Sequence, residues 1–240
     1  LGGRNIKIAA FAKGSGMIHP NMATMLAFLT CDVGIDKNLW DRMIKEASQL
    51  SFNAISVDGD TSTNDSFLAI NSGTQISNRY LPVIQEGINY VCQNLAKSIA
   101  RDGEGSNCLL EVLVTGLKDK LDALKIAKSI VNSSLVKTAV HGCDPNWGRI
   151  IAAAGNAGIE FNFATIDLFI GDFQILKKGN LETYSEEIII KYMKEKMNGS
   201  YLLNDTVKIT LNFNNGKAQA KAWGCDLSKK YIDINSLYRT

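Results

Sequence analysis

The chain has 240 residues, of which 45% are hydrophobic, so it can bury a sizeable core as one large domain or two smaller lobes. Its 26 basic and 24 acidic residues leave a net charge of +2 with no basic block, so neither a nucleic-acid nor a membrane partner is expected. No apolar run approaches the roughly 18 residues of a membrane span. A small molecule or another protein is the expected partner.

Hydrophobic periodicity predicts alternating strands and helices along the chain. In chain order, we expect a strand at 6–10, a helix at 36–50, strands at 51–57 and 67–71, a helix at 80–100, a strand at 109–114, a helix at 118–135, an alanine-rich stretch at 149–157, a strand at 166–170 and a helix at 185–197.

The last two predicted strands, 207–213 and 219–222, flank the turn residues Asn214, Asn215 and Gly216. This spacing is typical of an antiparallel hairpin. Helices mixed with an antiparallel hairpin favour an α+β layered architecture over a doubly wound parallel sheet.

Five cysteines are scattered along the chain without a C-x-x-C pair. An odd number without a signal peptide favours reduced thiols and a cytoplasmic location. The chain also does not begin with methionine, so we expect a fragment or a processed product. We interpret all five cysteines as core or incidental residues: Cys31, Cys92, Cys108, Cys143 and Cys225.

Residues 13–26, KGSGMIHPNMATML, contain the most informative motif. Gly14 and Gly16 permit unusual backbone conformations, and Pro20 ends regular structure. The loop leads into Thr24, which would carry a hydroxyl beside its own α-amino group if the chain were cut before it. That pair supplies both a nucleophile and a base. On the residues alone, the apolar run 22–29 would make Thr24 an ordinary core residue.

Three other polar segments stand out. Residues 58–65, DGDTSTND, lack the central glycine and terminal glutamate of an EF-hand, so a turn bonded by its own side chains is expected there and no metal. Glu104 lies between two glycines at a helix-to-strand turn, where it could point into a cleft or belong to an ordinary solvated turn. His141 lies in a Gly/Pro turn and is interpreted as structural.

Together these segments resemble the ornithine acetyltransferases, also called glutamate N-acetyltransferases, of the cyclic arginine pathway. The resemblance rests on five blocks that run in order from end to end of the chain. They are 13–26, 57–65, 101–105, 141–149 and 222–226, followed by the terminal YRT at 238–240. The resemblance implies a layered α+β sandwich of the self-cleaving type with a threonine nucleophile.

Members of that family are made as a precursor that cuts itself before the threonine, and the α and β chains stay associated. The resemblance therefore places the cleavage site between Ala23 and Thr24. Residues 1–23 would be the tail of the α chain, and 24–240 would be the catalytic β chain with two packed α+β lobes. Pairs of αβ units in the family imply an α2β2 assembly.

The resemblance also implies the chemistry. Thr24 would take the acetyl group from N-acetylornithine as an ester and pass it to glutamate in a ping-pong sequence. The matching substrate-binding residues are Lys13, Thr24, Glu104, Asn235 and Thr240, and the family's oxyanion-stabilising Thr-Gly pair belongs to the α chain. No metal or cofactor is implied, and the use of acetyl-CoA as a second donor stays open.

Two alternatives stay open beside this interpretation. A self-cleaving aminopeptidase of the related fold would use the same nucleophile to hydrolyse peptides. A chain that is never processed would be a structural or binding subunit. Lys13, Glu104 and the C-terminal Tyr-Arg-Thr favour transfer over hydrolysis, since an acceptor substrate needs a polar pocket.

Overall fold

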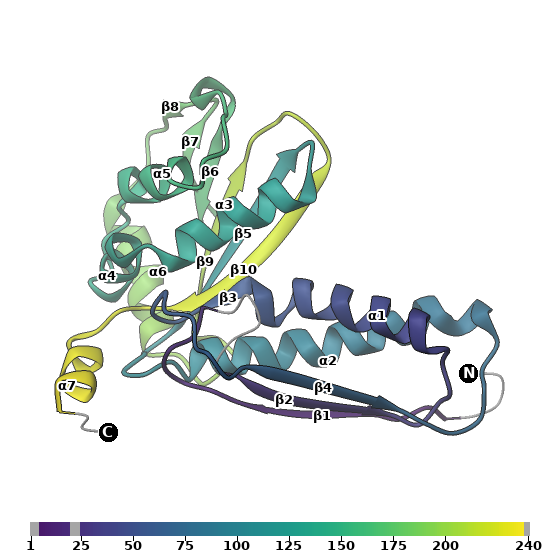
Figure 1. Ribbon diagram of the computed structural model, residues 1–240. Helices are drawn as coiled ribbons and strands as arrows, with labels where there is room; N and C mark the ends of the chain where they lie inside the picture. Colours follow the sequence, from purple (N-terminus) through teal and green to yellow (C-terminus); the bar gives the residue numbers. More distant parts are fainter. Residues whose placement is uncertain (1–4, 20–24, 238–240) are drawn as a thin grey trace.

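The chain folds into a three-stranded and a seven-stranded β-sheet, with helices packed against both (Figure 1). The computed structural model describes residues 5–19 and 25–237. Two clusters of buried apolar residues, one mainly around each sheet, form the core. Parallel and antiparallel strand pairs occur together with helices, which confirms the predicted α+β class.

The small sheet is made of β1 (Ile8–Lys13), β2 (Leu26–Cys31) and β4 (Ser66–Asn71). β2 is the central strand, antiparallel to β1 and parallel to β4. Side chains alternate between the two faces of a strand, and the inner residues Ala27 and Leu29 are each only 1% exposed. They belong to the same buried cluster as the apolar faces of two helices, α1 (Lys37–Leu50) and α2 (Leu81–Arg101).

Both helices were predicted to within one residue at each end, because their local signals are strong. The side chain of Asp36 accepts hydrogen bonds from the backbone N–H groups of Asn38 and Leu39 and thereby begins α1. Pro82 lies in the first turn of α2, where its missing N–H costs nothing. Figure 1 shows the two helices lying side by side over the small sheet.

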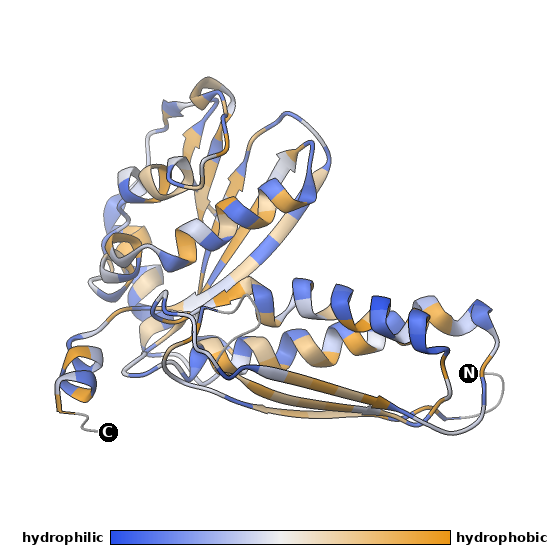
Figure 2. Ribbon diagram, in the orientation of Figure 1, coloured by the Kyte–Doolittle hydropathy of each residue, from blue (hydrophilic) through white to orange (hydrophobic). Residues whose placement is uncertain are grey.

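The outer face of the small sheet is apolar, and several of its side chains are exposed in the part of the chain that the structure describes. Phe11, Leu68 and Ile70 are 64%, 54% and 61% exposed, and Phe11 stacks on Phe28 with the ring centroids 4.8 Å apart. Figure 2 shows the hydrophobic colouring that runs along these three strands. A contiguous exposed apolar face of this kind marks an interaction surface.

The large sheet has the strand order β3-β10-β5-β9-β6-β7-β8. The inward side chains of its interior strand over residues 109–117, Leu110, Val112 and Val114, are fully buried in the same cluster as the apolar face of the third helix. The strands are β3 (Ile55–Ser56), β5 (Leu109–Leu117), β6 (Asp167–Ile170), β7 (Phe173–Lys177), β8 (Asn180–Leu181), β9 (Thr206–Asn212) and β10 (Ala218–Cys225). The remaining helices are α3 (Lys120–Asn132), α4 (Ser134–His141), α5 (Trp147–Gly155), α6 (Glu186–Met197) and α7 (Lys229–Leu237), with 3-10 turns η1 (Phe52–Ala54), η2 (Asn78–Tyr80) and η3 (Phe163–Thr165).

The predicted hairpin between the last two strands is wrong. β9 and β10 run in opposite directions but do not pair, because β5 lies between them, parallel to β9 and antiparallel to β10. The connecting loop instead crosses the end of β5, where the Asn215 N–H donates to the carbonyl of Gly116 at 2.7 Å. An apolar strand of nine residues gains more by pairing on both edges than the turn gains by closing a hairpin.

Three other predictions of local structure need correction. The helix expected over 118–135 is two helices, because Ser133 ends α3 and its hydroxyl accepts the N–H of Val136 to begin α4. Of the strand expected over 51–57, only β3 is a strand, and it follows the turn η1. The first predicted strand lies two residues early, since β1 begins at Ile8. The strands β2, β7 and β8 and the helices α4 and α7 were not predicted.

All five cysteines are buried and none forms a disulfide, which confirms their interpretation as core residues. Burial raises the pKa of Cys92 to about 12, so this thiol is not a reactive one. Among the helices that the structure describes, none is long and apolar enough to cross a membrane.

The loop over the end of β5 tests the corrected topology. A Cβ atom on Gly216 would lie 2.1 Å from the carbonyl oxygen of Leu117, so Gly216→Ala must displace backbone. We expect it to lower the free energy of unfolding by about 2 kcal/mol or more in urea denaturation. The matched control is Gly155→Ala, where an added Cβ meets nothing within 4 Å, and a neutral or slightly stabilising effect is expected. Equal effects of the two changes would contradict the crossing.

Candidate active site

A cleft of about 890 Å³ brings together three of the residues singled out from the sequence. Lys13 enters it from the end of β1, Glu104 from the turn after α2, and Asn235 from α7. These segments lie far apart in the sequence and meet only through the fold. Ala23, Thr24 and Thr240 lie outside the described residues.

Glu104 is held in this cleft by contacts on two sides. Its backbone N–H donates to the carbonyl of Ser15 at 3.1 Å, and its carboxylate accepts a hydrogen bond of 2.8 Å from the Asn235 amide. The carboxylate lies so close over Gly16 that an added Cβ there would come within 2.6 Å of it. Only glycine permits this approach, which accounts for one of the two glycines in the 13–26 motif.

Lys13 is the cation of the cleft. It is exposed at the last position of β1 and makes no ion pair with another described residue. A lysine in this setting can take a carboxylate ligand without first breaking an internal ion pair. The cleft therefore offers one cationic and one anionic end to a small zwitterion.

The loop that leads toward Thr24 is fixed by Asp58, which the sequence placed in a polar turn but not among the site residues. Its two carboxylate oxygens accept the N–H groups of Met17 at 2.6 Å and Ile18 at 2.9 Å. The hydroxyl of Tyr231 lies 3.4 Å from the same carboxylate, and burial followed by the charges of Asp58 and Glu104 raises the Tyr231 pKa to about 12. Residues 58–65 thus form a turn and also hold the 13–26 motif by hydrogen bonds. In the sequence, the only sign of this second role was the number of side-chain oxygens that can accept hydrogen bonds.

His19 connects this loop to the large sheet through hydrogen bonds. Its Nδ1 lies 3.0 Å from the hydroxyl of Ser56, which donates to Asn132 at the end of α3 at 2.8 Å. Because the serine proton goes to Asn132, the histidine must donate from Nδ1. Burial, and then the charge of Lys128, lower the pKa of His19, so it is neutral at pH 7.

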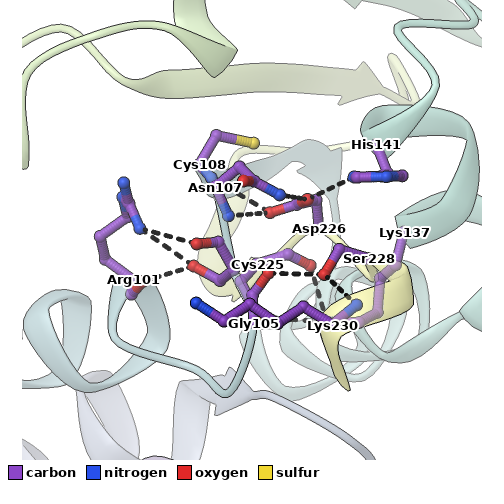
Figure 3. A network of polar contacts seen from close by, with 11 residues as sticks. Arg101, Gly105, Asn107, Cys108, Lys137, His141, Cys225, Asp226, Ser228 and Lys230 are labelled. Atoms are coloured by element: carbon purple, nitrogen blue, oxygen red, sulfur yellow. Dashed lines mark hydrogen bonds and ion pairs between the residues drawn. The ribbon is translucent and has the colours of Figure 1, made fainter. Parts of the chain in front are cut away.

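The turn that carries Glu104 rests on a buried polar network (Figure 3). At its centre, the Asp226 carboxylate accepts the backbone N–H of Asn107 at 2.6 Å, the side-chain amide of Asn107 at 2.8 Å and the N–H of Cys108 at 3.1 Å. His141 lies 2.9 Å from the same carboxylate. Its contact is therefore with a buried acid that does not line the cleft.

Two further contacts hold the same turn. Arg101 pairs with the fully buried Asp205, and its guanidinium also donates to the hydroxyl of Ser106 at 3.0 Å. The hydroxyl of Ser228 donates to the carbonyl of Gly105 at 2.6 Å. The turn is thus fixed from the start of β9 and from the segment after β10, which sets the position of Glu104.

No group of three or more histidine, cysteine or acidic side chains that could hold a metal ion occurs in the described part of the chain. The cleft itself presents lysine, carboxylate and amide groups. These groups bind and orient a small polar molecule and can move a proton.

The family model described as the ArgJ family matches residues 1–240. The chain is 66% identical over 238 residues to the arginine biosynthesis bifunctional protein ArgJ of Prochlorococcus marinus subsp. pastoris, covering 99% of this chain and 59% of that protein. It is 49% identical over 246 residues to ArgJ 1 of Nostoc sp., covering 100% of this chain and 60% of that protein. The chain thus spans about three fifths of the length of these curated relatives.

A solved structure is similar as well. The crystal structure of the arginine biosynthesis bifunctional protein argJ from Bacillus halodurans superposes with a TM-score of 0.80 at 41% sequence identity. The match covers 90% of this chain and 100% of that one.

The hydrogen bonds of Asp226 predict that loss of its carboxylate lowers the stability of the fold. Asp226→Ala leaves one buried and at least two partly buried donors without their acceptor, so we expect the free energy of unfolding to fall by about 3 kcal/mol or more. The matched control is Asp233→Ala on the exposed side of α7, for which a change within about 0.5 kcal/mol is expected. Denaturant titration measures both, and similar values for the two variants would contradict the central role of Asp226.

Proposed function

The chain belongs to the ArgJ family, and from this membership we propose that it carries the nucleophile and most of the substrate pocket of a self-processing acetyltransferase of arginine biosynthesis. The proposed reaction moves an acetyl group from N-acetylornithine to glutamate through an acetyl ester on Thr24. The observation that carries the proposal is the meeting of Lys13, Glu104 and Asn235 in one cleft beside the loop that leads to Thr24.

Self-cleavage would come first. The Thr24 hydroxyl attacks the carbonyl carbon of Ala23, and the acyl group moves from the nitrogen to the oxygen to form an ester. Water then hydrolyses that ester, which leaves a carboxylate on Ala23 and a free amine on Thr24. Residues 1–23 become the tail of the α chain, and residues 24–240 become the β chain with its two α+β lobes.

Acetyl transfer would then use the new amine as the base. An N-terminal amine has an ordinary pKa near 7.7 to 8.0, so part of it is unprotonated at neutral pH. It accepts the hydroxyl proton while Oγ attacks the acetyl carbonyl of N-acetylornithine, and ornithine leaves with that proton. Glutamate then enters, its amine attacks the ester, and N-acetylglutamate leaves as the Thr24 hydroxyl is restored.

Both amino acids carry an α-carboxylate, and we assign its recognition to Lys13, whose ammonium group makes charge-assisted hydrogen bonds with such groups. Glu104 is assigned to the amino group that reacts, as a hydrogen-bond acceptor or a proton carrier. Asn235 orients Glu104 by the 2.8 Å hydrogen bond. Thr240 completes the proposed pocket.

The α chain is the proposed partner. In the relatives, about two fifths of the protein lies outside the part that this chain matches. The exposed apolar face of the small sheet, with Phe11, Leu68 and Ile70, supports the packing of that further segment against it. We assign the oxyanion-stabilising Thr-Gly pair to the same segment and expect an α2β2 assembly in the cytoplasm.

No cofactor is needed for this scheme, since the acetyl group moves directly between two amino acids and the enzyme. Acetyl-CoA is proposed as an alternative donor in keeping with the name bifunctional that the relatives carry. Assaying glutamate acetylation with each donor in turn separates the two activities.

The function is tested with the full-length precursor and its Thr24→Ala variant. We expect the wild-type precursor to split into two fragments, and incubation with N-acetylornithine to add one acetyl mass to the fragment that begins at Thr24. The Thr24→Ala precursor should stay one polypeptide, whereas the control Thr183→Ala, an exposed position in the other lobe, should behave as wild type. Intact mass spectrometry measures all three.

An uncut wild-type precursor, or a Thr24→Ala variant that splits and turns over, would contradict the proposal. A wild type that splits but takes no acetyl group and hydrolyses peptides would favour the aminopeptidase interpretation instead.

The substitution Glu104→Gln tests whether the negative charge of Glu104 takes part in the proposed acetyl transfer. Glutamine preserves the shape and can still accept the hydrogen bond from Asn235, but it removes the negative charge. We expect self-cleavage to persist and kcat/KM for N-acetylornithine to fall by roughly a hundredfold or more. Glu86→Gln, exposed on the same helix that leads to Glu104, is the matched control and should leave kcat/KM unchanged. A normal rate in Glu104→Gln would remove this residue from the mechanism.

A further inference from the structure

A second cleft, of about 550 Å³, lies beside the candidate active site, between α2, α6 and the strands β5, β9 and β10. A volume of this order accommodates a small organic ligand. We call it the lysine cleft, because the charged side chains that line it are four lysines and two acids: Lys97, Lys196, Lys208, Lys221, Glu111 and Asp172. The excess of positive charge favours an anionic ligand.

Strand register builds one wall of the lysine cleft. On β5, Glu111 is opposite Lys208 of β9 and Trp223 of β10. Side chains alternate between the two faces of a strand, and the neighbouring Val112 is buried in the cluster that includes the apolar face of α3. Glu111 and Lys208 therefore project from the opposite face of the large sheet, into the lysine cleft.

One of the four lysines already has an acidic partner. The ammonium group of Lys221 lies 3.2 Å from the carboxylate of Glu111, which also accepts the indole N–H of Trp223 at 2.8 Å. Burial by itself raises the pKa of Glu111, but the hydrogen bond from Trp223 and the charges of Lys221 and Lys97 lower it overall. Glu111 thus stays ionised at neutral pH and holds Lys221.

The other three lysines have no acidic partner of their own. Lys97, Lys196 and Lys208 form no ion pair within residues 5–19 and 25–237. The Lys97 ammonium nitrogen lies 5.3 Å from the ring centroid of Trp223. That of Lys196 lies 5.4 Å from the ring centroid of Tyr192. An anion with several charged oxygens would complete ion pairs that the described residues leave open.

The lysine cleft adjoins the candidate active site. Ser98, near the C-terminal end of α2, lines both clefts. A ligand with an anionic end and a long arm can therefore occupy both clefts at once. N-acetylornithine and glutamate are short and carry only carboxylates as anionic groups. Acetyl-CoA has the required form, because it carries phosphoryl groups at one end and its thioester at the far end of the pantetheine arm.

We propose that the lysine cleft binds the phosphoryl groups of the nucleotide part of acetyl-CoA, while the acetyl-pantetheine arm passes Ser98 into the candidate active site. This inference rests on the proposed use of acetyl-CoA as a second donor. Lysine ammonium groups make charge-assisted hydrogen bonds with phosphate oxygens. In the transfer, the C–S bond of the thioester breaks and the C–O bond of the threonine ester forms. The hydroxyl proton ends on the sulfur, so that CoA leaves as the thiol.

The kinetic test uses the processed full-length protein that carries Lys196→Gln and Lys208→Gln together. KM for acetyl-CoA should rise about tenfold or more, because charge-assisted hydrogen bonds to phosphate are lost. KM for N-acetylornithine, which has no phosphate, should not rise with it. The matched control carries Lys45→Gln and Lys191→Gln, which remove the same charge at exposed positions outside the lysine cleft. It should match the wild type with both donors.

Two probes divide acetyl-CoA into its parts and need no variant. Adenosine 3′,5′-bisphosphate has the phosphates without the arm, so it should bind the processed wild type in calorimetry and compete with acetyl-CoA but not with N-acetylornithine. Its binding should weaken between about 0.1 M and 1 M salt, because the screening length falls from about 10 Å to about 3 Å. S-acetyl-N-acetylcysteamine has the thioester without the nucleotide, so its KM should exceed that of acetyl-CoA about tenfold or more.

The outcomes separate this inference from the proposed function. A wild type that neither splits nor takes an acetyl group from N-acetylornithine contradicts the function, and this inference with it. A wild type that does both overturns only the role of the lysine cleft if it cannot use acetyl-CoA or if the double variant keeps the wild-type KM for acetyl-CoA. An equal rise of KM for both donors would also overturn that role, because the lysines would then act through the structure of the active site.

Inorganic phosphate distinguishes the remaining source of the same chemistry. If inorganic phosphate binds the wild type as tightly as adenosine 3′,5′-bisphosphate does, the lysine cleft is a site for the free anion, and its assignment to acetyl-CoA is overturned. Tighter binding of the nucleotide, lost in the double variant and kept in the control, supports the assignment.

Discussion

The buried carboxylate of Asp226 is the interaction on which the rest of this structure depends. It accepts the two backbone N–H groups just before β5, an interior strand of the large sheet. The turn that it holds is also the direct connection from α2 to that strand, so it fixes how the small-sheet part joins the large-sheet part. Burying an acid is favourable here because its acceptor sites are matched by donors. A displaced turn would move Glu104 with it.

The candidate active site is a consequence of that junction. Its cleft draws Lys13 from one strand, Glu104 from the turn and Asn235 from the last helix. Each of these segments is fixed by contacts outside the cleft, such as those of Asp58 with the loop after β1. Within the cleft, Glu104 is held by the Ser15 carbonyl and the Asn235 amide without a ligand. Such preorganisation is what a transfer reaction needs, because little has to be reordered when a substrate binds.

Local signals in the sequence predicted some elements well and others poorly, for identifiable reasons. α1 and α2 carry long amphipathic patterns with a capping aspartate or an early proline, so their bounds followed from the residues alone. The helix over 118–135 was predicted as one because its apolar pattern continues past Ser133, where a single hydroxyl ends one helix and begins the next. The prediction of a final hairpin was wrong because β9 and β10 each pair with β5, about a hundred residues earlier in the chain, and this pairing outweighs the local turn.

The sequence by itself determined the α+β class, the family and the candidate residues Lys13, Thr24, Glu104, Asn235 and Thr240, because these depend on residue types and their order. Only the tertiary structure decided which of the described candidates share a cleft, and it showed that Asp58 holds the loop that lines it. It also decided that β5 separates the last two strands. The physical reason is that burial, strand register and hydrogen-bond partners are properties of segments distant in the chain, and no short stretch of sequence carries them.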